Sequence, residues 1–152
     1  MKDFPYAEAL QIVLGHCAPL PAESVPLAAA AGRVLAEAVR AAGDDPPAPK
    51  SAMDGFALRA AETQAASAAR PVPFAYQDVL GAGHVSASAV APGAAVRIMT
   101  GALLPPGVDA VAKQEDTRAL GAGRFAVTGP LRPGENVIGP GTALRAGTLL
   151  LG

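Results

Sequence analysis

Apolar residues near the start of the chain recur at helical spacing on a single face. The members of this face are Tyr6, Leu10, Val13, Leu14 and Cys17. Pro5 suits the first turn of a helix, and Asp3 is a candidate cap. The spacing predicts a helix over residues 5–16, and the place of Cys17 on its apolar face predicts a buried structural thiol.

The same spacing returns after the turn-rich residues 19–21. It is carried by Leu27, Ala31, Val34, Leu35 and Ala38. The pattern predicts a second helix over residues 27–39. Gly32 inside this helix weakens it relative to alanine, so we expect another backbone to approach closely there. Arg33 and Glu37 lie four residues apart and are expected to form a surface pair.

From residue 71 onward the pattern changes to short apolar runs separated by Gly and Pro, which is typical of strands. The predicted strands are residues 72–80, 94–99, 110–114, 124–128 and 148–150, and residues 55–58 can enter another. The alanine-rich residues 59–69 are expected to form a surface helix or loop. The predicted fold class is α+β, with two N-terminal helices and a small barrel-like or folded-sheet unit of short strands.

The composition favours thin layers over one thick core. Hydrophobic residues make up 51% of the 152 residues, but much of this is alanine, and aromatic residues are only 4%. The bulky side chains that carry most burial energy are therefore scarce. The net charge is -1, and the Lys and Arg residues are scattered singly. This distribution argues against nucleic-acid binding.

The cysteine content and the lengths of the apolar runs indicate in which cellular compartment the protein is expected. The single cysteine excludes an internal disulfide. No apolar run approaches the length of about 18 residues that a membrane-spanning helix needs, and residues 1–5 lack the apolar segment of a signal peptide. We therefore expect a cytoplasmic protein with no membrane partner. The apolar residues 148–152 predict either a domain cut from a longer protein or a terminal strand that pairs with a partner.

Residues 51–56, Ser-Ala-Met-Asp-Gly-Phe, place a carboxylate just after the stiff proline-rich residues 46–49. Such a placement fixes the direction of Asp54 better than a flexible loop would. An Asp-Gly pair between apolar residues is also a signal for a hairpin turn. The hexapeptide is longer than a turn requires, but the pair alone does not decide between a turn and a chemical role.

The hexapeptide resembles the signature of the molybdopterin molybdenumtransferases, the MoeA family that includes the E domain of gephyrin. A second block matches in order and spacing, at residues 97–102, 104–111 and 114–115. Two fainter blocks bracket these, at residues 31–37 and at residues 133–137 with Gly141 and Gly147. The resemblance therefore runs from about residue 31 to the last residue.

The resemblance implies a domain organisation and a reaction. Residues 1–45 and 130–152 would form an elongated helical and strand region, and residues 46–129 a β-rich linker domain that carries the signature motifs. The reaction is insertion of molybdate into adenylated molybdopterin with release of AMP. Such chemistry requires a divalent cation, usually Mg2+, held by one or two carboxylates together with substrate phosphate.

The resemblance also implies roles for individual residues. Asp54 would be a catalytic residue that holds the metal or positions the attacking oxygen, and Thr100 a second catalytic residue. Ser51, Gly55 and Gly101 would bind the substrate or its anion. The loop at Thr100 is expected to offer a hydroxyl and free backbone N–H groups, a concavity suited to molybdate or phosphate.

In the family the site lies between subunits, and the pterin nucleotide is bound by a following α/β domain whose motifs do not occur in this sequence. The chain is therefore expected to hold half of a site, to be inactive alone, and to act as a homodimer or with a separate pterin-domain protein. Residues 138–143 also lack the arginines and the Gly-Glu-Asp that the family usually carries. This departure supports an alternative, a non-catalytic paralogue acting as a dimerisation or scaffold module in cofactor assembly.

Overall fold

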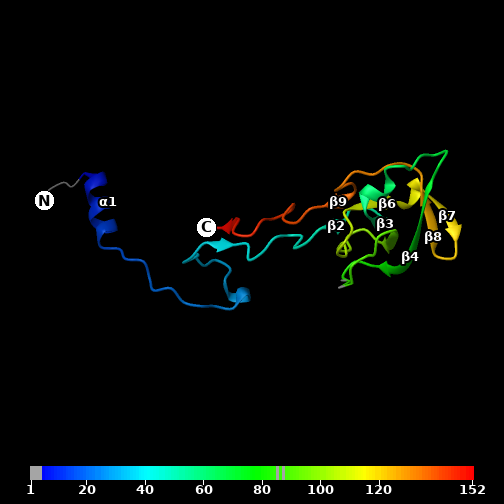
Figure 1. Ribbon diagram of the computed structural model, residues 1–152. Helices are drawn as coiled ribbons and strands as arrows, with labels where there is room; N and C mark the ends of the chain where they lie inside the picture. The colour runs from blue at the N-terminus through cyan, green and yellow to red at the C-terminus, as the bar shows by residue number, and fades with distance from the viewer. Residues whose placement is uncertain (1–4, 85, 87) are drawn as a thin grey trace. The chain divides into compact units, whose positions relative to one another are not determined.

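The computed structural model describes residues 5–84, 86 and 88–152, which form two compact units. Among the described residues, unit 1 comprises residues 5–38 with Gly152, and unit 2 comprises those from 39 to 151. Unit 1 contains the helix α1 (Tyr6–Gly15) and the short 3-10 helix η1 (Leu27–Ala29) (Figure 1). The predicted cap Asp3 lies outside the described residues. The predicted boundaries at residues 45 and 130 stay a prediction.

The first predicted helix is confirmed, because residues 5–16 were expected and α1 spans Tyr6–Gly15. Its apolar face is uncovered in the described part of unit 1, with Tyr6 82% and Val13 60% exposed. Cys17 is exposed as well, so the prediction of a buried thiol is wrong. Helical spacing fixes which residues share a face, but burial also needs a second layer for that face to pack against.

The second predicted helix, over residues 27–39, is wrong. Only η1 forms there, and Gly32 follows with a φ of +77°, outside the helical region. Among the described residues, no atom beyond the chain neighbours of Gly32 lies within 4 Å of the position that a Cβ would take there, so the expected close backbone approach is also wrong. Leu27 and Val34 are more than nine-tenths exposed. A short helix needs such residues to pack, and here they do not.

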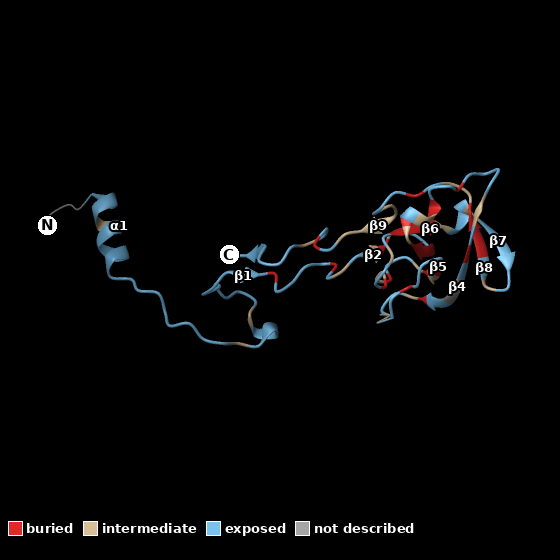
Figure 2. Cartoon of the chain, viewed as in Figure 1, coloured by how far each residue is buried: buried red, intermediate tan, exposed pale blue. Residues whose placement is uncertain are grey.

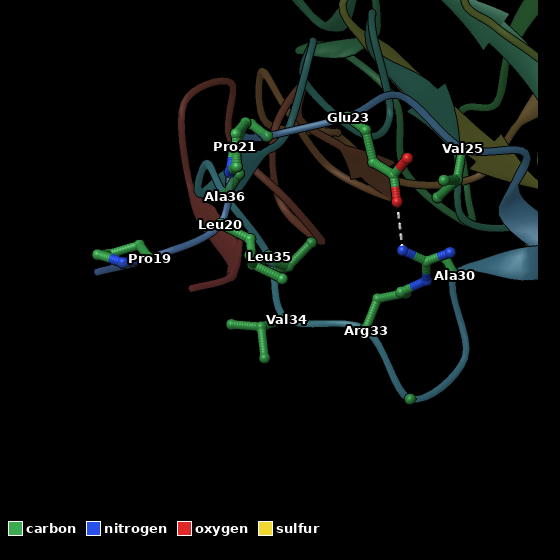
Figure 3. Close-up of a pocket in the computed structure, with 12 residues that line it drawn as sticks. Pro19, Leu20, Pro21, Glu23, Val25, Ala30, Arg33, Val34, Leu35 and Ala36 are labelled. Atoms are coloured by element: carbon green, nitrogen blue, oxygen red, sulfur yellow. Dashed lines mark hydrogen bonds and ion pairs between the residues drawn. The ribbon is translucent and has the colours of Figure 1, made fainter. Parts of the chain in front are cut away.

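A pocket of about 890 Å³ lies within unit 1, between residues 19–25 and residues 30–36. The side chains of Glu23 and Arg33 point toward one another across it and form an ion pair (Figure 3). The expected pair between Arg33 and Glu37 is replaced by this one. None of the sequence-predicted site residues lines the pocket.

Unit 2 is built on a six-stranded sheet. Its strands are β3 (Gly55–Leu58), β4 (Val72–Leu80), β5 (Ala94–Ile98), β6 (Ala110–Lys113), β7 (Thr117–Gly121) and β8 (Arg124–Val127). Their order is β6-β3-β5-β4-β8-β7, with β4 and β5 parallel and the other neighbours antiparallel. The sheet confirms the predicted folded-sheet unit, and it adds β7, which the sequence pattern did not indicate.

Buried residues lie along the strands of this sheet (Figure 2), and they form two clusters. One face contributes a cluster around Phe56, Phe74 and Phe125. The opposite face contributes a smaller cluster around Ile98 and Val111. Neighbouring residues of β3 belong to different clusters, as the alternation of a strand requires. The short 3-10 helix η2 (Ala60–Thr63) adds Ala60 to the first cluster, so residues 59–69 are not simply a surface helix or loop.

Two narrow ribbons join distant parts of unit 2. Strand β2 (Lys50–Ser51) pairs with β9 (Val137–Ile138), and β1 (Val39–Arg40) pairs with β10 (Leu149–Leu151), all antiparallel. The predicted terminal strand therefore pairs within the chain, with β1. A third 3-10 helix, η3 (Gln114–Asp116), follows β6. No helix in the described part of the chain is long and apolar enough to cross a membrane.

Candidate functional site

Two of the sequence-predicted residues meet at one corner of unit 2. Asp54 lies in the loop between β2 and β3, and Thr100 follows the end of β5. The backbone N–H and the Oγ1 hydroxyl of Thr100 both donate to Oδ1 of Asp54, each at 2.7 Å. Both residues are exposed. The corner therefore presents a carboxylate on the surface with its direction fixed by two bonds.

These bonds change the acidity of the carboxyl group. Hydrogen bonds from the backbone and then the side chain of Thr100 lower the pKa of Asp54 below its ordinary value of 3.8, with a smaller contribution from the positive charge of Arg97. Hydrogen bonds to the charged form favour ionisation. Asp54 is therefore a carboxylate at neutral pH. Both bonds go to Oδ1, so Oδ2 is left outside them.

The backbone around Asp54 is held from two sides. The N–H of Ser51 donates to the carbonyl of Ala102 at 2.9 Å, and the N–H of Gly101 donates to the carbonyl of Ser51 at 2.8 Å. From the other side, the N–H of Ala52 donates to the carbonyl of Asn136 at 2.9 Å. The faint sequence block at residues 133–137 therefore supports the loop that carries Asp54.

Ser51 and Gly55 have structural roles in this corner. Ser51 is fully buried, and its hydroxyl donates to the carbonyl of Met53 at 2.6 Å. A Cβ atom at Gly55 would lie 2.0 Å from the carbonyl oxygen of Ala112, so only glycine allows β3 and β6 to approach this closely. Their predicted role in binding an anion stays a prediction.

The expectation of free N–H groups at the Thr100 loop is wrong. The N–H of Thr100 bonds Asp54, that of Gly101 bonds Ser51, and that of Ala102 bonds the carbonyl of Met99 at 3.0 Å. These donors stabilise the corner, and the predicted role of Gly101 in binding the substrate or its anion stays a prediction. The sequence showed a turn here but not which acceptors the turn would meet.

Sequence reasoning assigned no role to two residues beside Asp54. The charge of Arg97 on β5 reaches Asp54, and the N–H of Gln114 donates to the Asp54 carbonyl at 3.0 Å. Both residues lie within the recognised sequence blocks. The pairing of β3 and β5 places Arg97 directly opposite Phe56, two residues from Asp54, and a single sequence does not show this pairing.

The corner can offer a metal ion one carboxylate. No cluster of three or more His, Cys, Asp or Glu side chains suited to a metal occurs among the described residues. Mg2+ is commonly held by only one or two carboxylates with phosphate oxygens and water. Asp54 therefore fits a metal that is shared with a phosphorylated substrate, and it does not fit a site made by this chain alone.

Replacing Thr100 with valine is expected to raise the pKa of Asp54, because the hydroxyl bond is lost while the backbone bond remains. The direction is upward from the wild-type pKa, because the hydroxyl bond from Thr100 is the second of the causes that lower it. The wild-type bonds stabilise the fold above the ordinary pKa of an unfolded Asp, and this stabilisation is lost as the pH falls through the lowered value. A pH titration that follows the 13C NMR signal of the Asp54 carboxyl carbon measures this change in pKa.

The control for this titration is Thr128→Val, which removes a hydroxyl that bonds the carbonyl of Asp116 away from Asp54. It is expected to leave the Asp54 pKa unchanged. An Asp54 pKa that is identical in the wild type and in Thr100→Val would contradict the geometry of the corner.

Comparison with known proteins gives consistent matches over nearly the whole chain. A family model described as the MoeA N-terminal region (domain I and II) matches residues 4–152. The molybdopterin molybdenumtransferase of Staphylococcus aureus strain Mu50 is 37% identical over 150 residues, which cover 99% of this chain. That of Bacillus subtilis strain 168 is 40% identical over 122 residues, or 78% of this chain.

Solved structures agree with the sequence matches. The molybdopterin biosynthesis MoeA protein from Pyrococcus horikoshii superimposes with a TM-score of 0.92 and 33% identity, covering 99% of this chain and 38% of that one. The chain spans 36% of the length of the Staphylococcus relative and 28% of the Bacillus relative. The likeness therefore covers one region of longer proteins.

Proposed function

Since this chain belongs to the MoeA N-terminal region family, we propose that it supplies half of an intersubunit site in molybdenum cofactor biosynthesis. At that site molybdate is inserted into adenylated molybdopterin and AMP is released. Asp54 and Thr100 are the residues contributed by this chain. The other half comes from a pterin-binding domain, either in a second copy of a longer chain or in a separate protein.

The observation that supports this proposal is the Asp54–Thr100 pair itself. A surface carboxylate usually samples several rotamers, and holding it in one direction costs conformational entropy. Here two bonds of 2.7 Å and a loop tied on both sides hold Asp54 toward solvent. Fixed, exposed and ionised groups of this kind are suited to act on a ligand that binds from outside the chain.

The residues present define what this chain contributes to the reaction. Oδ2 of Asp54 is the oxygen that would meet a Mg2+ ion, and Thr100 fixes the carboxylate through Oδ1. The ion, when bound, neutralises charge on the phosphoanhydride that is cleaved. Thr100 is thus a positioning residue that acts through Asp54. Gly55 lets β3 lie close to β6 directly after Asp54.

The direct test supplies the missing half in trans. The chain is mixed with a pterin-domain protein prepared from a longer relative by removing the region that this chain matches, and molybdate insertion is measured. Each component alone is expected to be inactive, and the mixture is expected to insert the metal. A mixture no more active than the pterin-domain protein by itself would reject the proposal.

One observation favours a second function, a non-catalytic dimerisation or scaffold module. Residues 138–143 lack the expected basic cluster, and their backbone is used for pairing: the N–H of Gly141 donates to the carbonyl of Pro46 at 3.0 Å. The scaffold function predicts that the chain dimerises or captures a partner while calorimetry detects neither molybdate nor Mg2+-nucleotide binding. Binding of either ligand would argue against it.

A further inference from the structure

Asn136 has an unusual backbone conformation beside the loop that carries Asp54. Its φ is +57°, in the left-handed region, and among the described residues other than glycine only Ala122 shares a positive φ. Such residues adopt this region rarely, and it persists where surrounding contacts hold it. Asn136 directly precedes β9, which pairs with β2 at the start of the Asp54 loop (Figure 1). The sequence assigned no role to Asn136.

The side chain of Asn136 is bound to the edge strand β6. Its Nδ2 amide donates to the carbonyl of Val111 at 2.8 Å. The N–H of the same Val111 donates to the carbonyl of Glu135 at 3.0 Å. Val111 is fully buried, so leaving its carbonyl without a partner would be costly. A residue with left-handed backbone cannot continue a strand, and here its side-chain amide takes the place of the N–H of a neighbouring strand.

The backbone carbonyl of Asn136 points to the Asp54 loop. It accepts a hydrogen bond from the N–H of Ala52 at 2.9 Å, which extends the pairing of Ser51 with Val137 by one residue. Rotation of Asn136 out of the left-handed region would redirect this carbonyl. The side-chain bond to β6 and the carbonyl bond to Ala52 therefore fix the same backbone conformation, and Asn136 links β6 to the loop.

Residues 52–54 are held to β6 at both ends. Ala52 is held through Asn136, and the carbonyl of Asp54 accepts a bond at 3.0 Å from the N–H of Gln114, which directly follows β6. The carboxylate of Asp54 is held separately, by Thr100 at the end of β5. The two bonds from Thr100 keep their geometry only while the loop backbone stays in register with β6.

We propose that Asn136 is a positioning residue for Asp54. It acts through the backbone of Ala52 and does not contact the substrate. The inference rests on the proposed function, in which Asp54 acts on a bound ligand, and it deepens that function by adding a residue on which the geometry of Asp54 depends. Asparagine suits both tasks, because it tolerates left-handed backbone and its amide nitrogen is a donor.

Two variants isolate the side-chain bond. Asn136→Gly tolerates a positive φ but has no side chain, and Asn136→Asp keeps the shape of the side chain but lacks the N–H donor. In both, exchange of the Ala52 amide hydrogen is expected to be about fivefold faster or more. The amide proton signal of Thr100 is expected to move upfield, because its bond to Asp54 lengthens.

NMR of the full 152-residue chain measures both effects, and thermal unfolding verifies that each variant is folded. If Asn136→Asp does not fold, Asn136→Gly alone decides, since it adds no charge beside the Val111 carbonyl. A Thr100 signal that stays at its wild-type position in the folded variants would overturn the proposal.

The matched control is Ala122→Gly, which also places glycine at a position of positive φ. Ala122 lies in the turn between β7 and β8, and β7 is at the opposite edge of the sheet from β6. In the reconstituted mixture, Asn136→Gly is expected to slow molybdate insertion by about fivefold to tenfold. Ala122→Gly is expected to remain within about twofold of the wild type. Equal rates in these two variants would overturn the proposal.

Asp54→Asn separates this inference from the proposed function. If Asn136 acts through Asp54, adding Asn136→Gly to Asp54→Asn will slow insertion no further. A further fivefold loss in that double variant would show general structural damage and would overturn the inference. A wild-type rate in Asp54→Asn would instead reject the proposed function, and the Thr100 signal of the chain alone would still decide whether Asn136 holds Asp54.

Discussion

Replacing Gly55 with alanine is expected to lower the free energy of unfolding of unit 2 by about 3 kcal/mol. The new Cβ would lie 2.0 Å from the carbonyl oxygen of Ala112 and 2.9 Å from its carbon. Both are backbone atoms, so no side chain can rotate away to make room. Relief requires β3 and β6 to separate where Gly55 faces Lys113. That separation also disturbs the layer formed by Phe56 and the loop that carries Asp54.

Urea unfolding followed through the amide NMR signals of β3 and β6 measures this effect within unit 2. The control is Gly129→Ala, because no atom of the described residues beyond its chain neighbours lies within 4 Å of its Cβ position. That variant is expected to change the free energy of unfolding by no more than about 0.5 kcal/mol. Equal stability of Gly55→Ala and Gly129→Ala would show that the close approach of β3 to β6 does not constrain this fold.

Replacing Asp54 with asparagine is expected to slow molybdate insertion in the reconstituted mixture by about a hundredfold or more. The amide keeps the size of the side chain, and its oxygen can still accept the two bonds from Thr100. It loses the negative charge, and its nitrogen cannot serve as a metal ligand. The substitution therefore removes the chemical contribution of Asp54 while the loop stays in place.

The matched control for this prediction is Asp78→Asn on β4. Asp78 is also exposed, and its carboxylate accepts a bond from the N–H of Val79 at 2.8 Å. Its replacement is expected to leave the insertion rate within about twofold of the wild type, as surface substitutions usually have small effects. A similar loss of rate in both variants would attribute the effect to net charge and not to the position of Asp54.

The strands and the meeting of Asp54 with Thr100 could be expected from the sequence. Alternating apolar runs bounded by Gly and Pro located β4, β5, β6 and β8 to within one or two residues, because the pattern carries both the period and the ends of a strand. The two signature residues were linked by resemblance to one family, and the structure brings them to 2.7 Å.

Other features depend on contacts that the sequence does not show. Residues 27–39 have apolar residues at helical spacing. In the described part of unit 1, however, Leu27 and Val34 are exposed and unpacked, and the backbone turns at Gly32. The hydroxyl of Ser51 donates its hydrogen bond to the carbonyl of Met53, within the chain. Arg97 and Gln114 are distant from Asp54 in sequence, so their place beside it emerges only with the strand register.

Whether Asp54 and Thr100 work as one unit is decided by the insertion rates of four chains in the reconstituted mixture: wild type, Asp54→Asn, Thr100→Val and the double variant. Groups that act through a single shared interaction do not have additive effects. If Thr100 serves only to hold the carboxylate, the double variant will be as slow as Asp54→Asn and no slower. A wild-type rate in Asp54→Asn, or a double variant slowed by the product of both single effects, would contradict this account.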